Sequence, residues 1–302
     1  MRAGMRRGIA GALTALVCVT LADAPSAVAS ASRGREVARP GTACSTRGAQ
    51  ATVAGRHLTC LLRDGRRTWV ATAARTQALR GDLTVLAAAS LTESFQAIAV
   101  AFERLHPAVR VHFSFGASSA LALQIDNGAP ADVFASASTT NMQQVVAAGQ
   151  ATRPVTFARN RLIIVTPPDN PGHITRLADL ARTGVSIAVC QAQVPCGVVA
   201  TQVLRKAHLT VTPATEEVDV KSVLSKVMLG EVDAGLVYVT DAHAAGASVA
   251  AITIPARDNA DTTYPIVALR ASQNPLAAQA FVAFVRSAKG KAALASVGFT
   301  VL

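Results

Sequence analysis

The sequence predicts an α/β fold in which strands alternate with helices. From Gly81 onward, short apolar runs alternate with segments in which apolar residues recur at helical spacing. The chain has 302 residues, of which 51% are hydrophobic, so it can bury one large core or two moderate ones. Both observations favour helices packed in layers on a largely parallel sheet.

Residues 1–29 have the pattern of an export signal. Arg2, Arg6 and Arg7 form a positive start, an apolar run follows over residues 9–22, and the small-x-small sequence of residues 27–29 precedes Ser30. The apolar run is too short for a comfortable membrane span. We therefore expect an exported protein that is periplasmic or extracellular and associated with the cell surface.

Cys18 lies inside this segment and raises the alternative of a lipid anchor. Lipid attachment signals usually carry a small residue before the cysteine, whereas this chain has Val17. The sequence therefore argues against a lipid anchor at Cys18.

Residues 30–80 form a separate basic segment. Ten arginines stand there against Glu36 and Asp64, whereas from Gly81 onward sixteen Lys and Arg stand against fifteen Asp and Glu. The net charge of +11 therefore belongs mostly to the N-terminal arm, and the main body is near neutral. With one Trp and two Tyr in the whole chain, nucleic-acid binding has little support.

The basic segment begins as a flexible linker and continues as a small disulfide-linked piece. Cys44 and Cys60 bracket a stretch with turn-forming glycines, which fits two or three short strands closed by a cross-link. Its arginines are either those of a solvated spacer or a means of holding the protein near an acidic cell surface.

Cleavage of the export signal leaves four cysteines, for which three pairings exist. The local pairs Cys44–Cys60 and Cys190–Cys196 are the simplest choice. Five residues separate the second pair, which is not a C-x-x-C motif, so we interpret both bonds as structural.

The main body begins with a strand, a serine and a helix. An apolar run over residues 84–89 ends at Ser90, and Phe95, Ile98, Phe102 and Leu105 then recur at helical spacing. Ser90 therefore lies at a helix start, where free backbone N–H groups and the positive end of the helix dipole favour an anion.

Three more junctions of this kind follow along the chain. Helical patterns begin after the turns at residues 116–119 and 194–197, and Asp219 is a plausible N-cap for a helix over residues 220–229. In open α/β sheets such junctions gather at the carboxyl ends of the strands, where ligands bind. The sequence therefore predicts an anion site built from several helix starts.

Several motifs, in register from about Leu83 to Phe299, resemble the molybdate-binding proteins of ABC importers. The resemblance does not cover residues 1–80. The motifs are AAASLTESF, FGASSALALQIDNGAPADVFASAS, RNRLIIVTP, VPCG, DVKSVLSKVMLGEVDAGLVYVTDA and YPIVAL.

The resemblance implies a two-lobed type II periplasmic-binding-protein fold with a hinged ligand cleft. Such a protein would capture molybdate or tungstate and deliver the oxyanion to an ABC importer permease. It would not be an enzyme and would bind no cofactor. We expect a monomer. Hydroxyls and backbone amides supply the ligand contacts in this family. Matched motif by motif, the ligand-binding residues are Ser90, Ser118, Cys196, Val220 and Tyr238.

Cys196 departs from the alanine that the family pattern leads us to expect. The contact there is a backbone N–H, so a different side chain need not abolish it.

The segments that cross between the lobes place lobe one at residues 81–157 plus 255–302 and lobe two at residues 158–254. The runs over residues 159–167 and 264–269 should pair near the hinge.

Other interpretations remain open at this point. The same fold could serve sulfate, phosphate or another small anion, and Ser90 could be a hydrolase nucleophile, although no G-x-S-x-G elbow surrounds it. Ser90 and Ser118 could be N-caps only, and Tyr238 a core residue. The six histidines lack metal-ligand spacing, so no site for a metal cation is expected.

Overall fold

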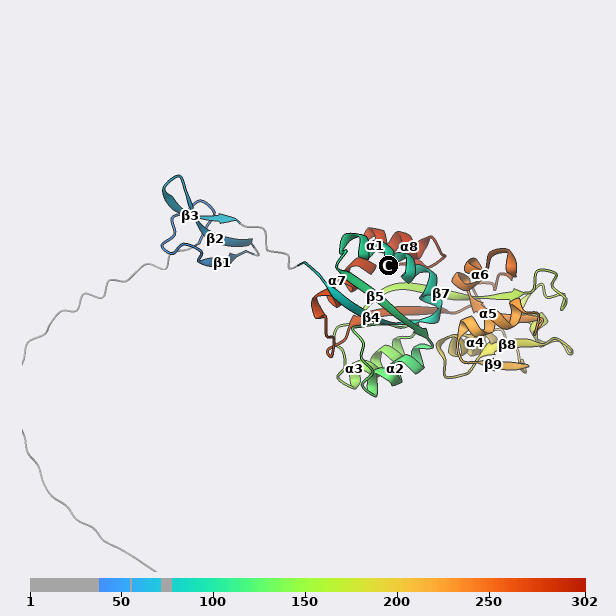
Figure 1. Cartoon of the computed structure of the whole chain (residues 1–302). Helices are drawn as coiled ribbons and strands as arrows, with labels where there is room; N and C mark the ends of the chain where they lie inside the picture. Colours follow the sequence, from blue (N-terminus) through green and yellow to red (C-terminus); the bar gives the residue numbers. More distant parts are fainter. Residues whose placement is uncertain (1–37, 55, 72–77) are drawn as a thin grey trace, which may run out of the picture. The chain divides into compact units, whose positions relative to one another are not determined.

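The computed structural model describes residues 38–54, 56–71 and 78–302 (Figure 1). The chain divides into two compact units, Met1–Thr76 and Gln77–Leu302. The expected export signal, with Cys18, lies outside the described residues. Within the described ranges, every helix falls short of the length and apolar character that a membrane span requires.

The first unit contains a small antiparallel sheet. Its strands are β1 (Gln50–Val53), β2 (Arg56–Arg63) and β3 (Arg66–Ala71), in that order. Asp64 and Gly65 form the tight turn between β2 and β3, and both have positive φ angles, as a two-residue hairpin turn requires. A disulfide joins Cys44 to Cys60, and Leu58 and Trp69 pack beside it. Because so small a core buries little apolar surface, the cross-link supplies much of the stability of this unit.

The second unit is organised on a ten-stranded sheet. The strand order is β5-β4-β6-β12-β7-β10-β8-β9, and β11 and β13 also pair with β7. The strands are β4 (Gly81–Ala88), β5 (Val109–Gly116), β6 (Val133–Ala135), β7 (Val155–Thr166), β8 (Ile187–Cys190), β9 (Thr215–Glu217), β10 (Ala234–Tyr238), β11 (Ala250–Ile252), β12 (Asp261–Ala268) and β13 (Thr300–Val301).

Strand β7 connects two halves of this sheet. In one half β4 runs parallel to β5 and β6, and in the other β8 runs parallel to β9 and β10. β7 pairs antiparallel with β12 up to Arg161 and with β10 from Leu162 onward. β7 and β12 therefore pair, but the two runs expected to pair are out of register: Tyr264 lies opposite Ala158, just before the first run, and Arg159 lies opposite Thr263, just before the second.

Helices cover both halves. In the first half, α1, α7 and α8 lie on one side of the sheet and α2 and α3 on the other (Figure 1). These helices are α1 (Thr92–Leu105), α2 (Ser118–Asp126), α3 (Thr139–Ala147), α7 (Pro275–Val285) and α8 (Ala288–Ala295). The second half carries α4 (Pro195–Lys206), α5 (Val220–Met228) and α6 (Val239–Ala245), and three 3-10 turns complete the unit, η1 (Ala89–Leu91), η2 (Leu177–Ala181) and η3 (Gly246–Ser248).

Each half has its own apolar core, which is what allows them to act as two lobes. The α1 core residues Phe95, Ile98 and Phe102 are buried, as their spacing predicts. Leu105, the last residue of α1, continues the helical spacing but is 51% exposed. The second half buries a separate cluster that includes Val203, Val223 and Leu236.

Candidate functional site

One pocket of the second unit is lined by all five residues that the sequence predicted to bind ligand. It contains roughly 210 Å³ of space that no atom fills, the solvent at its mouth included. Sites for drug-sized ligands usually measure about 300–1,000 Å³, so this pocket suits a small ion. Its lining consists of Ala88, Ala89, Ser90, Gly116, Ala117, Ser118, Ala137, Val194, Pro195, Cys196, Asp219, Val220 and Tyr238.

Three helices begin at this pocket. The N-cap residues of α2 and α4 are Ala117 and Val194, and neither makes a side-chain capping hydrogen bond. The first N–H groups of a helix have no acceptor within the helix, and they carry the positive end of its dipole. The α2 and α4 starts therefore bring unused backbone donors to the pocket wall.

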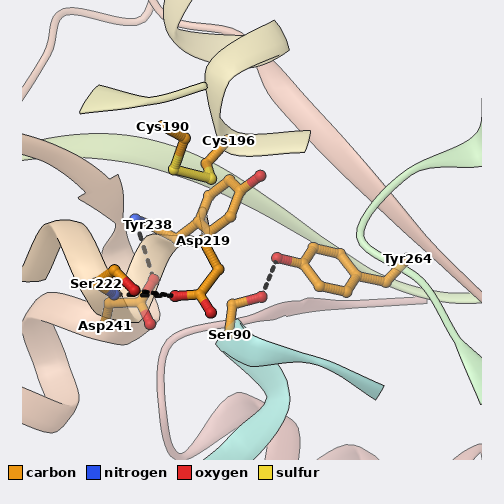
Figure 2. Close-up of a disulfide and its surroundings, with 8 residues drawn as sticks. All are labelled: Ser90, Cys190, Cys196, Asp219, Ser222, Tyr238, Asp241 and Tyr264. Atoms are coloured by element: carbon orange, nitrogen blue, oxygen red, sulfur yellow. Dashed lines mark hydrogen bonds between the residues drawn. A yellow bond between two sulfur atoms is a disulfide. The ribbon is translucent and has the colours of Figure 1, made fainter. Parts of the chain in front are cut away.

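Ser90 is buried within η1 and is not a helix N-cap, because the N-cap of η1 is Ala88 and that of α1 is Leu91. Its Oγ lies 2.8 Å from the hydroxyl oxygen of Tyr264, and Figure 2 shows the two side chains facing each other. When Tyr264 donates in this pair, the Ser90 proton is left to point at a ligand. None of the residues that line the pocket is a histidine, the base that most often activates a serine.

Ser118 is the first residue of α2 and does not cap it. Its Oγ accepts a hydrogen bond of 2.8 Å from the backbone N–H of Ala137. A hydroxyl that already accepts from one side keeps its own proton available for another acceptor. Ser118 is therefore arranged as a hydrogen-bond donor to the pocket.

Tyr238 ends β10 and is 1% exposed. Its hydroxyl has no hydrogen-bond partner among the described residues. The neighbouring Thr262 hydroxyl donates to the Ala137 carbonyl oxygen at 2.6 Å. Burial raises the pKa of Tyr238 well above its usual value, and the nearby Thr262 hydroxyl opposes this rise only in part, so the phenol stays neutral and keeps its proton. A buried hydroxyl without a partner is costly, and an anion in the pocket would remove that cost.

Cys196 reaches the pocket at the start of α4 and is disulfide-bonded to Cys190. Four cysteines can form two disulfides in three ways, and the structure has the arrangement in which both bonds are local, Cys44–Cys60 and Cys190–Cys196. The next residue, Gly197, has no room for a side chain, since a Cβ atom there would lie 2.0 Å from the Gln191 carbonyl oxygen. The glycine and the disulfide together hold the α4 start against the end of β8.

Asp219 caps α5, as its position before a helical pattern predicted. Its Oδ1 accepts hydrogen bonds from the Ser222 backbone N–H at 2.9 Å and from the Ser222 hydroxyl at 3.1 Å (Figure 2). This cap occupies the donor of the third helical residue and leaves Val220, the first, at the pocket wall.

The hydrogen-bond donors that the pocket offers to an oxyanion are neutral. No Lys, Arg or His lines it, and Asp219 is its one charged residue. Neutral donors can replace the hydration of an anion without a counter-charge that must itself be desolvated. Among the residues that the structure describes, no group of His, Cys, Asp and Glu is arranged to hold a metal ion.

Comparison with known proteins identifies the family. Residues 83–300 match the family model of the bacterial extracellular solute-binding proteins. The chain belongs to this family. A relative, the molybdate-binding protein ModA of Mycobacterium tuberculosis, is 41% identical over 218 residues, which cover 72% of this chain and 84% of the relative.

Two solved structures share the fold of this solute-binding protein. The periplasmic molybdate-binding protein of Azotobacter vinelandii has a TM-score of 0.66 at 23% identity, covering 73% of this chain and 99% of its own. The sulfate-binding protein SubI of M. tuberculosis has a TM-score of 0.63 at 20% identity, covering 73% and 86%. The predicted two-lobed periplasmic-binding-protein fold is thus confirmed, and the solute-binding protein is not an enzyme.

Sequence reasoning missed two residues that orient the pocket serines. The hydroxyl of Tyr264 is hydrogen-bonded to Ser90, 174 positions away, and the N–H of Ala137 donates to Ser118, 19 positions away. Tyr264 lies in the YPIVAL run, whose pattern marks a strand and carries no signal for a hydrogen bond to a serine 174 positions away.

Proposed function

We propose that this protein captures molybdate, and tungstate as well, outside the cytoplasm and delivers it to an ABC importer permease. The observation that carries the proposal is the convergence of Ser90, Ser118 and Tyr238, three buried hydroxyls, on the same small pocket as three helix starts. The 41% identity to a protein named as molybdate-binding supports the choice of anion.

The assignment of ligand contacts is part of the proposal. Hydroxyl protons of Ser90, Ser118 and Tyr238 and backbone N–H groups of Cys196 and Val220 would bind the oxyanion. Molybdate and tungstate are larger than sulfate, so a cavity shaped for them would hold sulfate with poorer contacts.

We further propose how the protein is organised around this task. Residues 81–157 plus 255–302 form lobe one and residues 158–254 form lobe two, and the lobes close by bending at β7 and at the return segment before β12. The mature protein is an exported monomer that binds no nucleic acid, and Cys18 is removed with the export signal instead of carrying a lipid.

Titration calorimetry of the purified mature protein with molybdate, tungstate, sulfate and phosphate tests the proposal. We expect saturable binding of molybdate and tungstate at least tenfold tighter than that of sulfate. Binding of sulfate without binding of molybdate would overturn the assignment. Ser118→Ala should weaken molybdate binding about tenfold or more, because a hydrogen bond to a charged group contributes about 1.5–3 kcal/mol.

Phosphate is the second candidate, and one observation favours it. Asp219 lines the pocket, and a carboxylate can accept the hydrogen of a protonated phosphate, which neutral donors cannot do. Against it, Asp219 Oδ1 is engaged in capping α5. If phosphate is the ligand, Asp219→Asn should weaken phosphate binding, whereas the same variant should bind a fully ionised molybdate at least as well.

A further inference from the structure

Lys221 connects the two halves of the sheet through an ion pair. Its Nζ lies 2.6 Å from Glu93 Oε1 in α1 and 3.2 Å from Asp241 Oδ1 in α6. Glu93 belongs to the first half and Lys221 to the second, 128 positions later in the chain. The other ion pairs between described residues each join two groups of the same half.

The same contacts lead directly to the pocket. Lys221 follows Val220 in the first turn of α5, so a contact that fixes the Lys221 side chain also restrains the backbone N–H of Val220. Asp241 accepts a hydrogen bond of 3.2 Å from the backbone N–H of Tyr238, which Figure 2 shows as a dashed line. A chain of polar contacts thus runs from Glu93 in one lobe to two of the proposed ligand residues in the other.

The exposure of the three charged side chains shows which ion pair persists and which can open. The Lys221–Asp241 pair persists, and the Lys221–Glu93 pair can open. Asp241 is fully buried, whereas 24% of the Lys221 side chain and 38% of the Glu93 side chain are exposed. Burial disfavours the Lys221 charge, but Asp241 and Glu93 outweigh it and raise the pKa of Lys221, so the ammonium stays charged. Lys221 must remain with Asp241, because a buried carboxylate without a cation is strongly destabilising. Glu93 can return to water when the lobes separate.

We propose that Lys221 is a positioning residue whose ion pair with Glu93 holds the lobes together over the pocket and slows the release of the bound oxyanion. The inference rests on the proposed function, because it concerns the same pocket. The pair forms only when the lobes meet, so it acts after the anion has entered. It therefore slows dissociation and leaves association unchanged.

Stopped-flow and calorimetric measurements with molybdate on Glu93→Gln test this proposal. We expect dissociation to be roughly two- to fivefold faster, as suits a partly exposed pair, with an unchanged association rate. The melting temperature of the anion-free variant should stay unchanged, because Glu93 is a partly exposed residue on the surface of α1. Lys221→Arg, which can still reach both carboxylates, should keep the slow dissociation.

A double-mutant cycle identifies the pair itself. The cycle is run with Asp241→Asn in every arm, so that no buried carboxylate is left without a cation. When Lys221→Gln is combined with Glu93→Gln in this background, the second substitution should have no added effect on dissociation. Lys226→Gln is the matched control, because Lys226 on the same helix pairs with Glu231 within one lobe. Equal dissociation rates for wild type and Glu93→Gln would overturn the proposal, as would an equal effect of Lys226→Gln. A wild-type protein that binds none of the four oxyanions would instead refute the proposed function.

Discussion

Replacing Tyr238 by Phe should change stability and anion binding in opposite directions. The substitution removes one hydroxyl that is buried and unpartnered among the described residues and changes little else. Leaving such a group unsatisfied costs about 1–3 kcal/mol, so the anion-free variant should be as stable as the wild type or more stable. For a unit of this size the gain corresponds to about 2–4 °C in melting temperature per kcal/mol.

Anion binding should weaken in the same variant. A hydrogen bond to a charged group contributes about 1.5–3 kcal/mol, which corresponds to a loss of affinity of about 10- to 150-fold. Calorimetry with molybdate measures the affinity, and thermal unfolding without and with molybdate measures the stability. At a fixed saturating concentration, the rise in melting temperature that molybdate produces should be smaller in the variant.

The second tyrosine of the chain provides the control. Tyr264 is equally buried, but its hydroxyl is hydrogen-bonded to Ser90, so Tyr264→Phe should lose about 0.5–1.5 kcal/mol of stability. If Tyr238→Phe is instead destabilised and binds molybdate normally, Tyr238 is a core tyrosine, and the reasoning from its orphaned hydroxyl is refuted.

Three further predictions concern the cross-link, the pH dependence and the N-terminal arm. Replacing Cys190 and Cys196 together by Ala should cost about 2 kcal/mol of stability, the value for so short a loop, and should weaken molybdate binding several-fold. An unchanged affinity in calorimetry would show that the disulfide does not help to position the ligand contacts. Burial raises the pKa of Asp241 from 3.8 to about 6, so the folded state holds a proton that the unfolded state has lost. Stability should therefore fall as the pH rises from about 4 to about 6, and denaturation of Asp241→Asn over this range should lack that slope. Deleting residues 30–80 should leave molybdate affinity unchanged, and a large loss in calorimetry would show that this arm contributes to the site.

Much of the fold could be predicted because its signals are local. The junction at Ser90 is a buried strand followed within a few residues by a helical pattern, and both parts appear in the structure as β4 and α1. The cap at Asp219 and the turn before α4 are likewise properties of short stretches. Since parallel strands present their carboxyl ends at one edge, local junctions were enough to predict a shared site.

What could not be predicted depends on pairs of distant side chains. The Ser90–Tyr264 hydrogen bond and the Glu93–Lys221 ion pair join residues 174 and 128 positions apart, and neither has a periodic pattern. Leu105 shows the limit of periodicity itself. Helical spacing marks the direction of a side chain, but it does not show whether the neighbouring element extends far enough to cover it.

The strand order has a consequence for how the exported chain folds. β12 lies between β6 and β7 in the first half of the sheet, and β13 pairs with β7, so this half needs segments from both ends of the second unit. Contacts between residues so far apart form slowly, because a long loop must close before they are made. Until β12 has left the ribosome, β6 has no partner on one side. The first half of the sheet is therefore completed only near the end of synthesis, after every strand of the second half has been made.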